Sequence, residues 1–358
     1  NTFEHYYLSG GVLMIVNIQE FNSFLKKLIS ESDNFADIIS VYRTPLVIGK
    51  QDSFHFRLYD TSEKAELNFY RTVDPIKILF YLFREQVYPI KENNKKRIIL
   101  GVKACDLKAL HLLDKAMLQS GFVDPAYKQW RDNTLIISSD CDYLHETCSC
   151  NLVNGHPYSE SGFDLNLSVI DGNYLIGIGS ERCQEFIEFM KKEITVANST
   201  ISDLEIVKSN RAKVFKQLVE KNNHLNHSND FSEFRKVEHK NWEEVSKECI
   251  GCGACTNICP TCYCLILNDE SSDKEFVKVR SYDSCQWFGY ARVAGGGTPR
   301  PKMAERFRNR YLCKFDYMQK NFGEIGCTGC GRCTEACAAK IDFHEAVKNV
   351  SALAQEVN

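Results

Sequence analysis

Two stretches near the C-terminus repeat one spacing of cysteines. The first has the pattern C-x2-C-x2-C-x3-C followed by proline, and the second has the same spacing followed by alanine. Three cysteines on a tight turn can bind three irons of a cubane cluster, and in proteins with two such clusters the fourth cysteine binds the other cluster. The spacing therefore predicts two [4Fe-4S] clusters, one held by Cys249, Cys252, Cys255 and Cys337, the other by Cys327, Cys330, Cys333 and Cys259.

The residues around these cysteines favour iron over zinc. Structural zinc sites bring together pairs of C-x2-C, whereas here three cysteines follow one another and a fourth precedes proline. Ala338 replaces that proline in the second motif, which affects a turn and removes no metal ligand. Glycines between the cysteines let the backbone wrap closely around a cluster and offer amide donors to its sulfurs: Gly251, Gly253, Gly329 and Gly331.

A third group of cysteines lies in the N-terminal half. Cys105 follows the apolar segment 97–102, and Cys141 follows the apolar segment 134–138; both segments have the pattern of buried strands. Sites in open α/β sheets lie at the carboxyl ends of strands, so adjacent strands would bring these thiols together, with a C-x-C pair folded back over them. The spacing leaves two interpretations open. Either Cys105 is a buried small residue and only the C-x-C pair is reactive, or a third [4Fe-4S] cluster is held by Cys105, Cys141, Cys148 and Cys150.

The segment 260–326 between the two motifs carries cysteines whose role the spacing does not define. Cys262, Cys264 and Cys285 could form an incomplete ligand set, or they could pack as small, soft residues against the clusters. Cys313 has no assigned role. Within 299–314, six basic residues accompany a single acidic one, Glu305, and could raise a cluster's reduction potential, dock an acidic partner or form a solvated helix face; they are Arg300, Lys302, Arg306, Arg308, Arg310 and Lys314.

Composition limits the class of protein. The chain has 358 residues, 44% of them hydrophobic, and a net charge of −3, which gives no electrostatic argument for nucleic acid. The 17 cysteines are odd in number and clustered, and no export signal precedes them, so metal ligation in a reducing compartment is favoured over disulfides. Because no apolar run is long enough to span a membrane, we expect a cytoplasmic protein.

The elements that would position these cysteines form two regions. Strands and helices alternate over 14–235, which predicts an α/β (α+β) domain with a parallel or mixed sheet. One of its helices is expected over 106–118, with Asp106 as the cap at its start. The region 240–358 is predicted to be a helical, ferredoxin-like domain with two clusters and an insert at 260–326. Cys183 is expected to be a core residue.

Five stretches occur in a fixed order: GVKACDLKALHLLD, SSDCDYLHETCSC, CIGCGACTNICPTCYC, YDSCQWFGYARVAGGG and CTGCGRCTEACAAKID. In this order they resemble the family of iron–sulfur electron-transfer subunits that includes the beta subunit of soluble sulfhydrogenases and the corresponding iron–sulfur subunit of anaerobic sulfite reductase. The stretch GFDLNLSVIDGNYLIGIG is similar to the sulfhydrogenase branch. The departures from the family pattern are Ala338 for proline, Cys313 for histidine and Ser149 for an aromatic residue.

The resemblance implies a subunit that passes electrons between a flavin subunit using NAD(P)H and a catalytic subunit. That catalytic subunit is a [NiFe] hydrogenase in one branch and a sirohaem sulfite reductase in the other. The resemblance also favours the third cluster at the N-terminal cysteines. Two alternatives remain: a stand-alone reductase whose N-terminal domain binds a flavin or substrate, and a zinc scaffold. The sequence shows no catalytic set of side chains, so we assign no catalytic residue.

Overall fold

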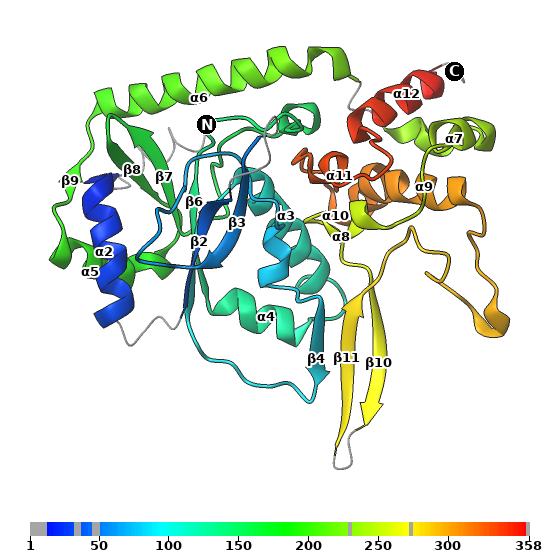
Figure 1. Ribbon diagram of the computed structural model, residues 1–358, viewed down its shortest axis with the longest axis horizontal. Helices are drawn as coiled ribbons and strands as arrows, with labels where there is room; N and C mark the ends of the chain where they lie inside the picture. Colours follow the sequence, from blue (N-terminus) through cyan, green and yellow to red (C-terminus); the bar gives the residue numbers. More distant parts are fainter. Residues whose placement is uncertain (1–12, 32–36, 45–50, 228–230, 272–274, 356–358) are drawn as a thin grey trace.

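A computed structural model describes residues 13–31, 37–44, 51–227, 231–271 and 275–355. Figure 1 shows a sheet-containing half on one side and a helical, C-terminal half on the other. In the described residues no helix is both long enough and apolar enough to cross a membrane.

The N-terminal half is built on a sheet of eight strands in the order β3-β2-β5-β6-β7-β8-β1-β9. The neighbours β2–β5, β5–β6 and β6–β7 are parallel, and the remaining pairs are antiparallel. This confirms the predicted mixed sheet. The strands are β1 (Met14–Asn17), β2 (Asp37–Thr44), β3 (Ser53–Leu58), β5 (Arg97–Val102), β6 (Thr134–Ser139), β7 (Leu165–Ile170), β8 (Asn173–Ile178) and β9 (Ala197–Asn198).

Helices cover both faces of this sheet. The helices α2 (Ile18–Glu31) and α5 (Gln184–Glu193) place aromatic and aliphatic side chains in one hydrophobic core, which also contains the fully buried Cys183, as predicted. The helices α3 (Ala104–Met117) and α4 (Pro125–Asp132) contribute to a second core with residues of β5 and β6. Apolar residues of β5 and β6 alternate between the two cores, because successive side chains of a strand point to opposite faces.

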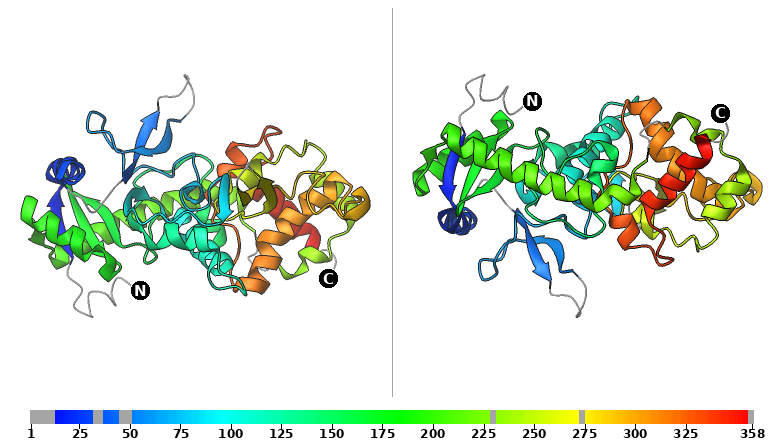
Figure 2. Two further views of the ribbon diagram at one scale, coloured as in Figure 1. Left: turned by 90° about the horizontal axis from the view of Figure 1, so that it is seen from below. Right: turned by 90° about the horizontal axis from the view of Figure 1, so that it is seen from above.

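The long helix α6 (Ile201–Asn222) begins at a capping box formed by Thr200 and Asp203. Leu204 and Val207 near its start pack against the sheet, and Figures 1 and 2 show the helix running from the sheet toward the C-terminal half. The Lys221 ammonium and the Asn222 amide at its end both donate to the backbone carbonyl of Cys148. This helix is therefore a connection between the two halves.

The C-terminal half is helical and has its own aromatic core, which includes Trp242, Tyr311 and Phe343. A three-stranded sheet with the order β10-β11-β4 projects from it, and its strand β4 comes from the N-terminal half. The elements are β4 (Arg84–Tyr88), α7 (His239–Val245), α8 (Ala254–Asn257), β10 (Leu265–Ser271), β11 (Phe276–Tyr282), α9 (Met303–Leu312), a π-helical turn (Cys313–Tyr317), α10 (Met318–Phe322), α11 (Arg332–Glu335) and α12 (Phe343–Gln355).

One prediction about local structure is wrong. Asp106 does not cap the helix predicted over 106–118, because α3 begins at Ala104, with Lys103 at the cap position. The Asp106 carboxylate instead accepts hydrogen bonds from the Ile76 backbone amide and from Arg332. The long-range ion pair with Arg332 gives this buried carboxylate a partner that local capping rules could not indicate.

Candidate metal centres

The second cysteine motif encloses a small cavity with one cysteine of the first. Cys327, Cys330 and Cys333 line this cavity together with Cys259, which lies 68 positions earlier in the sequence than Cys327. Gly329 and Gly331 have φ angles of 63° and 71°, so the backbone can turn around the cavity, and the Gly329 amide points to the Cys327 sulfur at 3.4 Å. The arrangement has the four thiols that the crossed two-cluster pattern requires.

The first motif forms a second group with the last cysteine of the other motif. The Cys249 thiol lies close enough to Cys255, Cys337 and Cys252 for their charges to influence it. Burial raises its pKa, and a hydrogen bond from the Gly251 amide opposes that rise. Cys252 is exposed, whereas the other three are partly buried. This group therefore reaches the molecular surface.

The four N-terminal cysteines gather at the carboxyl ends of β5 and β6, which are adjacent and parallel. The charges of Cys148 and Cys141 both raise the pKa of the buried Cys150, so these three thiols lie close together. Cys105 lies near Cys141. Burial raises the pKa of Cys141 to about 12, while the Lys103 ammonium opposes that rise. Lys103 is buried, and it donates to the Ser139 hydroxyl at 2.8 Å. A buried cation beside these thiols suits a site whose occupied form carries negative charge.

The second motif lies against these N-terminal cysteines. Cys105 is within electrostatic reach of Cys330, and the Arg71 guanidinium donates to the Cys330 carbonyl at 2.7 Å. Arg332 donates to Asp106 at 2.7 and 2.9 Å, and both side chains are buried. The backbone of Gly329 packs directly on that of Cys150. The second and third groups are therefore neighbours.

The cysteines of the insert also come together. Cys262, Cys264 and Cys285 line one cavity, and Cys313, which the sequence left without a role, lines it with them. Of the six basic residues within 299–314, Arg306, Arg310 and Lys314 are buried, so the solvated-face interpretation does not hold for these three. Arg310 and Lys314 line both this cavity and the cavity of the second motif.

Polar atoms around the cysteine groups fit iron–sulfur clusters. The Nε of Arg310 and the Oγ1 of Thr328 are buried and have no hydrogen-bond partner among the described residues, and both residues line the cavity of the second motif. Cluster sulfurs are acceptors that such donors could satisfy. No group of three or more His, Cys, Asp or Glu in the described part of the chain is placed around a single ion. Ligands at the corners of a cluster stand further apart than those of one ion.

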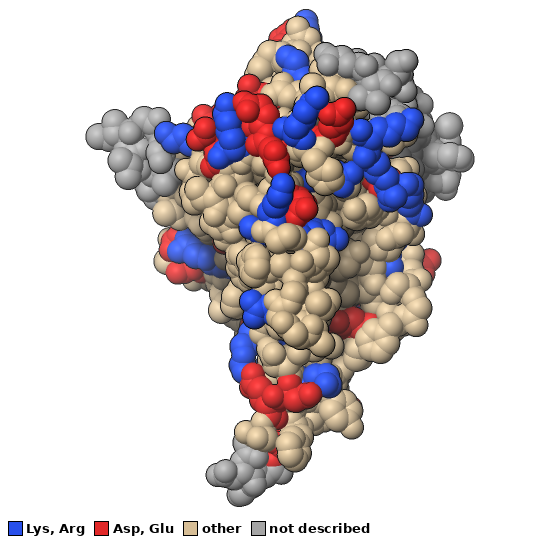
Figure 3. All heavy atoms as spheres, turned by 90° about the vertical axis from the view of Figure 1, so that its right-hand side faces the viewer, with Lys and Arg blue, Asp and Glu red and all other residues tan. Residues whose placement is uncertain are grey.

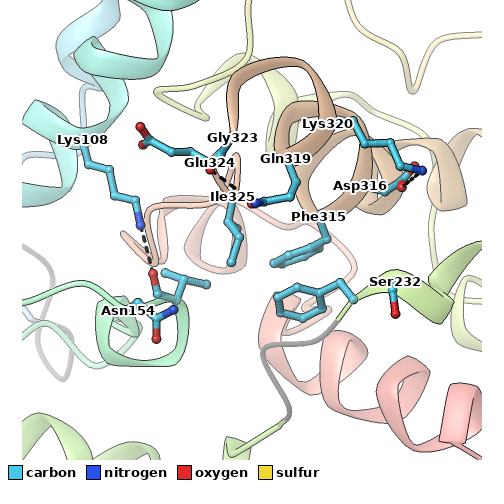
Figure 4. A pocket seen from close by; sticks show the side chains of 12 residues that line it. Lys108, Asn154, Ser232, Phe315, Asp316, Gln319, Lys320, Gly323, Glu324 and Ile325 are labelled. Carbon is cyan, nitrogen blue, oxygen red and sulfur yellow. Dashed lines mark hydrogen bonds and ion pairs between the residues drawn. The ribbon is translucent and has the colours of Figure 1, made fainter.

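A separate cavity of about 570 Å³ contains no cysteine in its lining. Figure 4 shows Lys108 and Asn154 on one side of it and Phe315 and Gln319 on the other. Lys108 donates to the Val153 carbonyl at 2.9 Å, so its ammonium is already engaged. Seen from the C-terminal half in Figure 3, positive and negative side chains are interspersed, without one dominant sign.

Sequence reasoning missed three residues of these sites. Cys313 stands alone in the sequence, 28 positions after Cys285, and only its place directly after the basic α9 segment could have drawn attention to it. Arg71 is a cation with no motif around it, and Lys103 lies within the stretch GVKACDLKALHLLD without a spacing that marks it as a site residue. Their place in the sites depends on tertiary contacts, Arg71 with the Cys330 carbonyl and Lys103 with Ser139, that form only in the folded chain.

Comparison with known proteins identifies a domain family and a similar protein. Residues 248–341 match the 4Fe-4S dicluster domain family. Over 308 residues the chain is 32% identical to the protein named sulfhydrogenase 2 subunit beta of Pyrococcus furiosus, an alignment that covers 83% of this chain and 89% of the relative. The match to the dicluster family confirms the prediction of two [4Fe-4S] clusters in the C-terminal part of the chain.

Proposed function

The chain belongs to the family of sulfhydrogenase beta subunits, and on this basis we propose that it relays single electrons between a flavin subunit that uses NAD(P)H and a catalytic subunit. The family and the dicluster domain make it an iron–sulfur electron-transfer subunit of an oxidoreductase. The partners are the proposed part. The hydrogenase branch is favoured for the catalytic subunit, because the similar protein is named a sulfhydrogenase; a sirohaem sulfite reductase is the second candidate.

The observation that carries this proposal is the succession of cysteine groups across the molecule. The first group reaches the surface at Cys252, the second has partly buried cysteines and the buried Cys330, and the third lies at the sheet, with Cys105 near Cys330. The charge of Cys259 raises the pKa of Cys255, so the first group adjoins the second. Such a succession suits electrons that enter at one surface and leave at another.

We assign the ligands as the spacing predicted. Cys249, Cys252, Cys255 and Cys337 would hold one [4Fe-4S] cluster, and Cys259, Cys327, Cys330 and Cys333 would hold the second. The third would be held by Cys105, Cys141, Cys148 and Cys150, and its support is their convergence beside Lys103. We also propose that residues 14–235 and 240–358 are the two domains.

Iron–sulfur clusters supply one-electron redox chemistry when bound. The side chains around them control charge and solvent. The buried guanidinium of Arg310 interacts with Cys255 and Cys333, so one cation acts on both groups of the dicluster domain. The aromatic core with Tyr311 and Phe343 packs beside Cys249, Cys327 and Cys333 and keeps water away from them. Positive charge and hydrogen-bond donors near a cluster raise its reduction potential.

The proposal is tested with the complex purified under anaerobic conditions. Substituting Cys255→Ser removes a ligand of the first group, and we expect electron transfer from NAD(P)H to the native catalytic partner to fall by at least about tenfold. Dye-linked activity of the catalytic partner should remain, because it bypasses the relay. Cys183→Ser is the matched control, since Cys183 is buried in the sheet core, away from every cysteine group.

Transfer that survives in Cys255→Ser would contradict the relay. The proteins that co-purify with the chain identify the branch: a hydrogenase pair would support the favoured partner, and a sirohaem protein would replace it with the second candidate.

A further inference from the structure

Four cysteines of the insert surround a cavity of about 380 Å³ that the two ferredoxin-type groups do not use. They come from three separate places in the chain. Cys262 and Cys264 follow the first motif, Cys285 follows β11, and Cys313 begins the π-helical turn after α9. Segments far apart in the sequence therefore place four thiols around one cavity. Packing of a hydrophobic core does not require such a convergence of cysteines.

Two of the four thiols contact each other and polar groups, and a third, Cys262, contacts Cys259 of the first motif. Cys264 and Cys285 are in contact, and Cys264 lies 3.6 Å from the Tyr290 hydroxyl. The Gln286 amide lies 3.5 Å from the Cys285 sulfur. Sulfur is a weak acceptor as a thiol and a stronger one as a thiolate, so the Gln286 amide, which donates to Cys285, suits the metal-bound form. The Cys264 thiol donates to the Tyr290 hydroxyl, which as a hydroxyl can itself donate to a thiolate.

Three buried cations lie beside the same thiols: Lys77, Arg310 and Lys314. Arg310 and Lys314 line the cavity itself, and Lys77 donates to the Cys262 carbonyl at 3.0 Å. Within the described parts of the chain, none of the three forms an ion pair with a carboxylate. A buried cation without a counter-charge is costly, and thiolates bound to iron would supply that charge.

We propose that Cys262, Cys264, Cys285 and Cys313 bind a further iron–sulfur centre, in addition to the two clusters of the dicluster domain and the third at the N-terminal cysteines. A zinc ion held by sulfurs at about 2.3 Å occupies little space, whereas this cavity has room for several irons and sulfides. The centre would adjoin both clusters of the dicluster domain. The charge of Cys285 raises the pKa of Cys255 in the first group, and the charge of Cys259 from the second group raises the pKa of Cys313. Metal binding would release the thiol protons.

The test is the metal content of the full chain, purified anaerobically and reconstituted with ferrous iron and sulfide. Cys285→Ala and Cys313→Ala remove ligands from different elements, and each should lower iron and acid-labile sulfide by about four per chain. Cys183→Ala is the control and should leave both unchanged. Electron paramagnetic resonance of the reduced protein should lose one signal in each ligand variant and keep those of the other clusters.

Cys313→His separates ligation from packing. Imidazole can bind iron, so this variant should retain the iron that Cys313→Ala loses, and its neutral ligand should raise the reduction potential of that one centre. Unchanged iron in both alanine variants would overturn the proposal, as would one zinc per chain that disappears with them. The readout is metal content, so it does not rest on the proposed relay, and a complete set of clusters without electron transfer would contradict the relay alone.

Discussion

The two ferredoxin-type motifs share one cysteine spacing and have opposite surroundings. Ile250 of the first motif is 67% exposed, whereas the equivalent Thr328 of the second is 3% exposed. Ala254 of the first corresponds to Arg332 of the second, whose guanidinium is buried against Asp106. The cysteines decide which groups can bind a cluster. The residues between them decide whether that cluster faces a partner or the interior of its own chain.

The largest expected effect concerns the buried ion pair that only the second motif has. Arg332→Leu leaves the Asp106 carboxylate buried without its partner, and we expect the free energy of unfolding to fall by about 3–5 kcal/mol. The measurement is the urea midpoint followed by circular dichroism under anaerobic conditions. The double variant Arg332→Leu with Asp106→Leu removes both charges and should recover most of the loss. If the double variant were as unstable as the single one, packing would outweigh charge here.

A smaller difference is expected between equivalent glycines. A side chain at Gly329 would overlap the backbone of Cys150, whereas one at Gly251 would meet only the flexible end of Met303. Both positions have positive φ, so Gly251→Ala should cost about 1 kcal/mol, and Gly329→Ala about 2–4 kcal/mol. Thermal unfolding of the two variants side by side provides the comparison. Equal costs would show that the second motif is not held tightly against the N-terminal cysteines.

The smallest effect on stability is expected at the exposed position of the first motif. Ile250→Ser should change the free energy of unfolding by no more than about 0.5 kcal/mol, because the side chain is largely exposed. If the proposed partner docks at this exposed face, we expect electron transfer to or from it to slow, since an apolar contact beside the first group is lost. Steady-state transfer rates at several partner concentrations measure this. An unchanged transfer rate would show that the proposed partner does not dock at the face that contains Ile250.

The sequence predicted the parts of the molecule that depend on local spacing. The mixed sheet followed from the apolar runs that became β5 and β6, and the two clusters followed from the repeated cysteine pattern. The role of Asp106 was misjudged because a carboxylate near a helix start has the pattern of a cap, while its partner Arg332 lies 226 residues away. Cys313 was left unassigned for the same reason. Its neighbours in space are cysteines that no spacing rule connects to it.

The helix α6 joins the two halves as a rod of about 33 Å, at 1.5 Å per residue over its 22 residues. One end packs on the sheet, and the other, through Lys221 and Asn222, holds the carbonyl of Cys148. Each residue added to a helix also turns it by about 100°. Its length can therefore change only in whole turns if both ends are to keep their contacts, one on the sheet and the other on the loop that carries Cys148.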